Sequence, residues 1–144
     1  MPIVASFIAG FVSTLLFHQG LVALLSATGA PITAYDMSAT WPLGVPQVIS
    51  LAFWGGVWGV ILWFVIGVRT RLAYWGYAVL IGAVAPTVVA MAVVFPLKGI
   101  AITATKVAAG LILNGVWGLG VALLMKLYWV TFHRSSEETA KPGA

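Results

Sequence analysis

The sequence predicts an all-α, polytopic membrane protein in which four transmembrane helices form a bundle. Three observations support this fold class. Hydrophobic residues make up 62% of the 144 residues and charged residues only 7%, whereas soluble domains carry about 25% charged residues. Four apolar segments are each long enough to cross a bilayer, which takes about 20 helical residues. The tetrapeptide Gly-Val-Trp-Gly occurs twice, from Gly56 and from Gly115, which indicates two related helical hairpins.

The first predicted span covers residues 3–25 and the second covers residues 48–68. Both are almost free of charged side chains. The connection between them, residues 29–47, is the longest in the chain. It is expected to form an irregular loop because four residues that favour turns interrupt it, namely Pro31, Pro42, Gly44 and Pro46.

The third predicted span covers residues 74–95 and the fourth covers residues 107–130. The connection between them, residues 96–106, is expected to be either a loop or a partial re-entrant turn lying in the interface. Residues 133–144 are polar and are expected to form a short disordered cytoplasmic tail. The sequence therefore predicts one four-helix transmembrane domain, residues 1–132, followed by this tail.

The distribution of Lys and Arg predicts the orientation. One side of the membrane receives five of these residues and the other receives two, Lys98 and Lys106. Because cytoplasmic loops are enriched in Lys and Arg, both termini are expected in the cytoplasm. The net charge of +4 favours contact with anionic membrane lipids, and no nucleic-acid partner is expected. The five residues on the predicted cytoplasmic side are Arg69, Arg71, Lys126, Arg134 and Lys141.

The first and third spans also resemble each other. Residues 8–14, Ile-Ala-Gly-Phe-Val-Ser-Thr, align with residues 81–87, Ile-Gly-Ala-Val-Ala-Pro-Thr. Both spans would run in the same direction, so the hairpins would be parallel repeats related by an axis along the membrane normal. The alternative is chance, since the match is short and its residues are common in membrane helices.

Small residues recur at every fourth position of each span, which places them on one helical face. In lipid, helices gain little by burying apolar surface against one another, so their association depends on close backbone approach and on hydrogen bonds. These rows therefore predict the helix contacts of the bundle. The glycines expected to make them are Gly10, Gly55, Gly59, Gly82, Gly110 and Gly118.

Among the residues in these rows, His18 and Asn114 have the side chains whose burial in the membrane costs the most free energy. Each lies seven residues inside its span, about 10 Å deep. One interpretation is a polar cavity in the outer half of the membrane that binds a small apolar or amphipathic ligand, such as a quinone or a lipid. The other is that the two side chains hydrogen-bond to each other or to carbonyls and fix the register of the bundle. The other candidates for this layer are Ser50, Trp54, Thr87 and, beside His18, Gln19.

Other chemistries lack suitable residues. The absence of Cys excludes disulfides, thiolate catalysis and cysteine-based metal sites. No carboxylate lies within any predicted span, so no catalytic residue and no metal site are assigned. Haem usually needs two strong ligands at one depth, and a single chain offers only His18 at this level. The sequence therefore predicts no bound cofactor. The alternatives are that the protein binds a haem or a quinone.

Four runs of residues carry a resemblance to a known group of proteins. They are Phe-His-Gln-Gly at 17–20, residues 44–59, Pro-Leu-Lys-Gly at 96–99 and residues 114–120. These runs resemble a group of small, four-span proteobacterial inner-membrane proteins without an established activity, and the resemblance covers most of the chain except the tail. It implies a multi-pass protein of the bacterial inner membrane and supplies no catalytic residue. The sequence thus favours a non-catalytic structural or accessory component that packs with itself or with a larger membrane complex.

Overall fold

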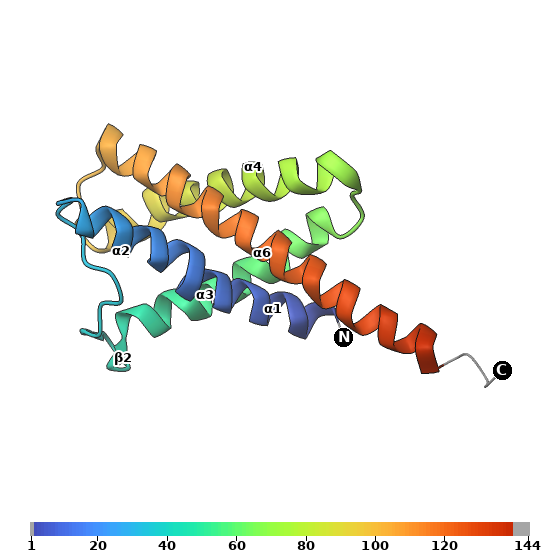
Figure 1. Cartoon of the computed structure of the whole chain (residues 1–144). Helices are drawn as coiled ribbons and strands as arrows, with labels where there is room; N and C mark the ends of the chain where they lie inside the picture. Colours follow the sequence, from blue (N-terminus) through green and yellow to red (C-terminus); the bar gives the residue numbers. More distant parts are fainter. Residues whose placement is uncertain (1, 140–144) are drawn as a thin grey trace.

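The computed structural model describes residues 2–139, with side chains described through Phe132, and confirms the all-α four-helix bundle (Figure 1). Its four long helices are apolar enough to cross a membrane, so the chain is a multi-pass membrane protein. The first span consists of α1 (Pro2–Ser13), the π-helical turn η1 (Thr14–His18) and α2 (Gln19–Ala27). The second is α3 (Gln47–Ile66). The third consists of α4 (Arg71–Val89), the π-helical turn η2 (Ala90–Val94) and α5 (Phe95–Leu97), and the fourth is α6 (Ala104–Thr139).

The long connection after α2 contains a short antiparallel hairpin, which the sequence did not predict. Its strands are β1 (Ala39–Thr40) and β2 (Val45–Pro46), with Thr40 opposite Val45. The Thr40 hydroxyl donates to the Val45 carbonyl at 2.7 Å, and the Gly44 N–H donates to the Thr40 carbonyl at 2.7 Å. Gly44 has a φ of +68°, a conformation that glycine adopts without steric cost. These contacts close the turn between the strands.

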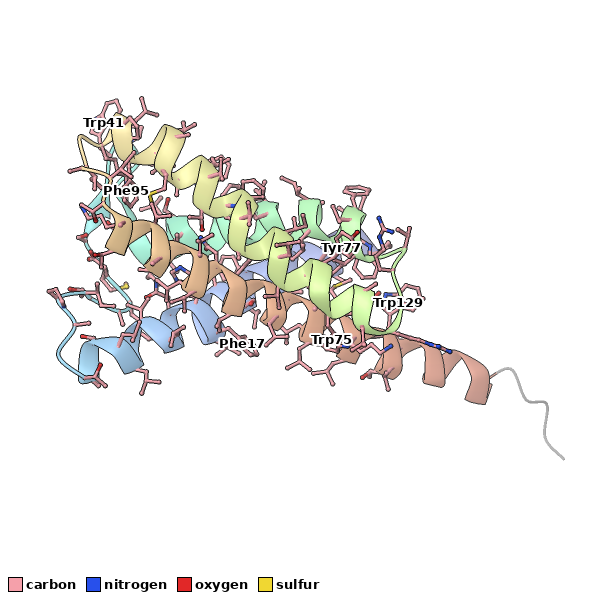
Figure 2. The ribbon with its side chains drawn as sticks, turned by 90° about the horizontal axis from the view of Figure 1, so that it is seen from above. Phe17, Trp41, Trp75, Tyr77, Phe95 and Trp129 are labelled. Atoms are coloured by element: carbon pink, nitrogen blue, oxygen red, sulfur yellow. The ribbon has the colours of Figure 1, made fainter. Side chains whose placement is uncertain are left out.

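The bundle has two distinct ends. The hairpin end carries the β1–β2 hairpin and residues 98–103, which connect α5 to α6 as a loop. The basic end carries the turn at residues 67–70, the start of α1 and the last part of α6. Aromatic side chains lie toward both ends, as in the interfacial belts of membrane proteins. Figure 2 shows Trp41 and Phe95 at the hairpin end, and Trp75, Tyr77 and Trp129 toward the basic end.

Helix α6 is longer than the predicted fourth span. It continues through residues 133–139, which the composition had assigned to a disordered tail. No glycine or proline follows Gly120 until Pro142, so no residue in this stretch interrupts the backbone hydrogen bonds of the helix. Residues 140–144, the rest of the predicted tail, lie outside the described residues.

The tightest helix contacts join glycine backbones. A Cβ atom placed on Gly10 of α1 would lie 2.9 Å from Gly59 Cα of α3, and one placed on Gly82 of α4 would lie 2.8 Å from Gly118 Cα of α6. Real Cβ atoms essentially never lie within 3.0 Å of another heavy atom. Only glycine fits at these positions, so α1 pairs closely with α3 and α4 pairs closely with α6.

These contacts also define how the two hairpins correspond. Gly10 and Gly59 in the first hairpin occupy the places of Gly82 and Gly118 in the second. The sequence alignment pairs Gly10 with Ala83, so the packing shifts the third span by one residue. The alignment also paired Ile8 with Ile81, but Ile8 is exposed whereas Ile81 packs against the core. In the second and fourth spans, Gly59 corresponds to Gly118, and this is the pairing that the two copies of Gly-Val-Trp-Gly predict.

The apolar core lies toward the basic end. It joins the second half of α3 and the middle of α6 with single residues from α1 and α4. Toward the hairpin end, the buried residues include the polar side chains of Gln19 and Thr87. The bundle is therefore apolar at one end and partly polar at the other. The core residues are Ala9, Leu62, Ile66, Ala78, Trp117, Val121, Ala122 and Met125.

Replacing Gly10 with alanine is expected to lower the free energy of unfolding by about 1–3 kcal/mol, because the new methyl group forces α1 and α3 apart. Gly20→Ala is the matched control, since a Cβ on Gly20 meets no atom within 4 Å. The control is expected to be neutral or stabilising by about 0.5–1 kcal/mol, because alanine favours helix more than glycine does. Reversible unfolding in lipid bicelles would measure both. Equal stabilities of the two variants would contradict the contact assigned to Gly10.

Candidate functional site

The structure gives Asn114 a partner other than His18. Asn114 Nδ2 donates to the hydroxyl of Thr87 at 2.9 Å, which joins α6 to α4 within the second hairpin. Thr87 is buried. Gly110, one turn before Asn114, leaves room for Thr87, since a Cβ there would lie 3.0 Å from the Thr87 methyl carbon. Gly110, Asn114 and Thr87 together form a contact that fixes α4 against α6.

His18 lies beside the buried face of the first span and not at its centre. A regular helix would place His18 on the same row as Gly10 and Thr14. The π-helical turn inserts one residue, because the Gln19 N–H bonds to the Thr14 carbonyl five residues earlier. Gln19 is therefore the next buried residue after Thr14, and His18 is half-buried. The Nδ1 atom of His18 is buried and has no hydrogen-bond partner among the described residues.

Gln19 attaches the loop after α2 to the first span. Its Oε1 accepts a hydrogen bond from the Tyr35 N–H at 2.8 Å, and the Tyr35 hydroxyl donates to the Leu15 carbonyl at 2.9 Å. Tyr35 has a φ of +52°, a left-handed conformation that is unfavourable for a residue with a side chain. Two hydrogen bonds to the first span hold this strained residue in place. Gln19 therefore serves the loop, and no contact of the structure links it to Asn114.

The same loop carries Asp36, which lies outside the spans. The Ser38 N–H donates to Asp36 Oδ1 at 2.8 Å and holds the pKa of this carboxyl below its ordinary value. The Asp36 carbonyl accepts from the Val48 N–H at 2.9 Å, and the Ser38 carbonyl accepts from the Gln47 N–H at 2.9 Å. Asp36 and Ser38 thus hold the loop against the first turn of α3.

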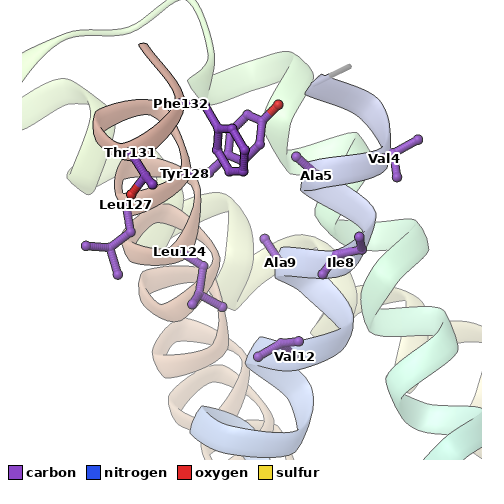
Figure 3. A pocket seen from close by; sticks show the side chains of 10 residues that line it. All are labelled: Val4, Ala5, Ile8, Ala9, Val12, Leu124, Leu127, Tyr128, Thr131 and Phe132. Carbon is purple, nitrogen blue, oxygen red and sulfur yellow. The ribbon is translucent and has the colours of Figure 1, made fainter. Parts of the chain in front are cut away.

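Ser50 and Trp54 lie away from the two apolar grooves of the described chain. Ser50 is half-buried, and Trp54 is 58% exposed with its ring packed edge-on against Phe53 at 5.8 Å between centroids. Two apolar grooves lie elsewhere in the described chain. One, of about 490 Å³, lies between α1 and α6 at the basic end (Figure 3), and the other, of about 290 Å³, lies between α4 and α6. None of the six residues predicted for the polar layer lines either groove.

Two hydrogen bonds that the sequence did not predict connect the hairpins. Trp117 Nε1 donates to the Gly10 carbonyl at 3.1 Å, and the Ser13 hydroxyl donates to the Trp117 carbonyl at 2.7 Å. Both cross from α1 to α6, and both side chains are buried. Ser13 lies three residues after Gly10 and so shares its helical face. That spacing is the signal that could have placed Ser13 at a helix contact.

A third unpredicted bond joins the two helices of the second hairpin. The Tyr74 hydroxyl donates to the Ala122 carbonyl at 2.7 Å. This bond ties the first turn of α4 to α6 near the basic end.

In chemical terms, the fully buried polar side chains of the spans are neutral, and each of them hydrogen-bonds to another group of the chain. Across the side chains described, no three His, Cys, Asp or Glu residues come together as a group that could hold a metal ion. No protein-family model, curated protein or solved structure matches the chain.

The bond between Asn114 and Thr87 is expected to appear as an energetic coupling. Unfolding of Asn114→Ala, Thr87→Ala and the double variant should give a coupling of about 0.6–1.7 kcal/mol, the range for hydrogen bonds between membrane helices. Ser50→Ala combined with Thr87→Ala is the matched control, because no hydrogen bond joins these two residues, and its effects should add. Strict additivity of the Asn114 and Thr87 substitutions would exclude the bond as a stabilising contact.

Proposed function

We propose that this protein is a non-catalytic structural or accessory component of the bacterial inner membrane that packs with a second copy of itself or with a larger membrane complex. The proposal is supported by the hydrogen bonds that the polar side chains of the protein make. Ser13, Asn114 and Trp117 donate to groups on neighbouring helices. Polar side chains used in this way hold helices together and do not line a site for a reacting molecule.

The apolar groove between α4 and α6 supports packing against a partner. The predicted glycine rows are used in contacts within the chain, whereas the α4–α6 groove faces outward. Ala83 and Gly115 lie close together in this groove, since a Cβ on Gly115 would lie 3.5 Å from Ala83 Cβ. Small residues allow another helix to approach closely. The groove is lined by Val79, Ala83, Leu111, Ile112, Gly115, Val116 and Leu119.

The proposal places the basic end in the cytoplasm. That end carries Arg69, Arg71, Lys126 and Arg134, whereas Lys98 and Lys106 lie at the hairpin end. The positive-inside rule favours this orientation. The resemblance to four-span proteobacterial proteins supports the bacterial inner membrane as the location.

Photo-crosslinking from the α4–α6 groove tests the proposal. The chain has no cysteine, so a benzophenone maleimide can be attached at Ile112→Cys, whose wild-type side chain is 59% exposed, or at the control Phe64→Cys on α3, where it is 68% exposed. Irradiation of native membranes is expected to join the Ile112→Cys protein to a second copy or to another membrane protein. The control should give mainly lipid adducts. Lipid adducts alone from both positions would contradict the proposal.

The unpartnered Nδ1 of His18 favours a second candidate function, the binding of a small apolar or amphipathic molecule such as a quinone or a lipid near the hairpin end. On this hypothesis His18→Ala leaves the unfolding free energy close to that of the wild type. It lowers the quinone or lipid that co-purifies in mild detergent, as measured by mass spectrometry. Ser50→Ala is the control and should retain the molecule. Unchanged co-purification, or loss of the fold in His18→Ala, would count against a ligand at His18.

A further inference from the structure

The groove between α1 and α6 has the size and lining of a binding site for a hydrocarbon chain. Its volume of about 490 Å³ lies within the range of about 300–1,000 Å³ for small-molecule sites. It follows each helix over nine residues, from Val4 to Val12 and from Leu124 to Phe132, which is about 12 Å along the axis. Nearly all of its lining is apolar, and only Tyr128 and Thr131 bring side-chain oxygens to it.

The shape of the groove is elongated along the helices. Figure 3 shows the rings of Tyr128 and Phe132 projecting from α6 toward α1 near the basic end. Their centroids lie 4.8 Å apart, so the two rings form one aromatic wall. Val12 and Leu124 line the end of the groove nearer the middle of the bundle. The groove therefore runs from the basic end toward the middle of the bundle, the direction in which a lipid chain extends from the membrane surface.

The charge at the basic end, where the groove lies, favours an anion. Helix α1 begins there, and the first N–H groups of a helix present a partial positive charge. Over the described residues 2–139, the basic end carries four Lys or Arg residues and two Glu residues, Glu137 and Glu138, so its net charge is positive. Basic groups beside grooves between transmembrane helices bind anionic lipid headgroups.

The walls favour a lipid chain over a helix of another protein. The close helix contacts at Gly10, Gly59, Gly82 and Gly118 depend on the absence of a side chain. The α6 wall of the groove contains no glycine or alanine, so the helix of another protein could not approach α6 as closely here. We propose that the groove binds an acyl chain of an anionic membrane phospholipid, with the headgroup at the basic end.

Native mass spectrometry of the whole protein tests this assignment, with phosphatidylglycerol and phosphatidylcholine of identical chains as probes. The wild type is expected to retain phosphatidylglycerol in preference to phosphatidylcholine. Ala5→Phe fills the groove and should lower phosphatidylglycerol retention by about tenfold, since each buried CH₂ group contributes to lipid affinity. Ala108→Phe is the matched control, because Ala108 is exposed on α6 nearer the hairpin end, and it should bind as the wild type does. Equal retention of the two lipids by the wild type, or wild-type retention by Ala5→Phe, would overturn the proposal.

A second measurement avoids any dependence on the folding of Ala5→Phe. Phosphatidylglycerol with a diazirine on its acyl chain is incorporated with the wild-type protein into nanodiscs and irradiated. Peptide mapping is expected to concentrate the adducts in residues 4–12 and 124–132. Adducts spread evenly over the four spans would show ordinary solvation by lipid and would refute a site in the groove. A second copy in the groove would instead give protein–protein dimers that Ala5→Phe abolishes, which would also refute the lipid assignment.

Discussion

The bundle depends on Gly10, whose backbone serves two neighbouring helices at once. Its Cα lies so close to Gly59 that no side chain fits between α1 and α3. Its carbonyl accepts from Trp117 Nε1 at 3.1 Å and from the Thr14 hydroxyl at 3.0 Å. In lipid, where burial of apolar surface between helices contributes little, such backbone contacts and hydrogen bonds supply the association energy. Gly10 thus links the α1–α3 pair to α6, and through α6 to α4.

The two hairpins share a packing geometry but use their polar residues differently. Gly82 and Gly118 repeat the contact of Gly10 with Gly59, yet Asn114 stands where the first hairpin has Gly55. The second hairpin therefore holds itself together through the bond of Asn114 to Thr87. The first hairpin instead directs Ser13 and the Gly10 carbonyl toward Trp117. The shared glycines set the helix spacing within each hairpin, and the residues that differ determine how the hairpins join.

The sequence predicted the four spans because apolar length and composition are properties of each segment alone. The depth predicted for Asn114 and His18 uses the same kind of information, namely the number of residues to the end of each helix. The sequence could not predict their partners, which depend on rotation about the helix axis. The π-helical turn at Thr14–His18 changes that rotation by one residue and brings Gln19 to the buried face. The prediction that every fourth residue shares one face assumes a regular helix. That prediction is wrong where a π-helical turn interrupts the helix.

The irregular turns and the core lie in different parts of the bundle, and this separation has a physical cause. Both π-helical turns, η1 and η2, lie in the half of their spans toward the hairpin end, whereas the residues of the apolar core lie toward the basic end. A π-helical turn rearranges backbone hydrogen bonds and disturbs the row of residues on a helical face. A core packed around buried Trp117, Val121 and Met125 tolerates such a change poorly, because every side chain there already has neighbours in contact. The hairpin end has fewer buried apolar residues, and the hydrogen bond between Gln19 and Tyr35 holds the loop there. A shift of one helix relative to another therefore costs less free energy at the hairpin end. Relative movement of the spans is therefore expected to pivot about the Gly10 and Trp117 junction and to be largest at the hairpin end, beside His18.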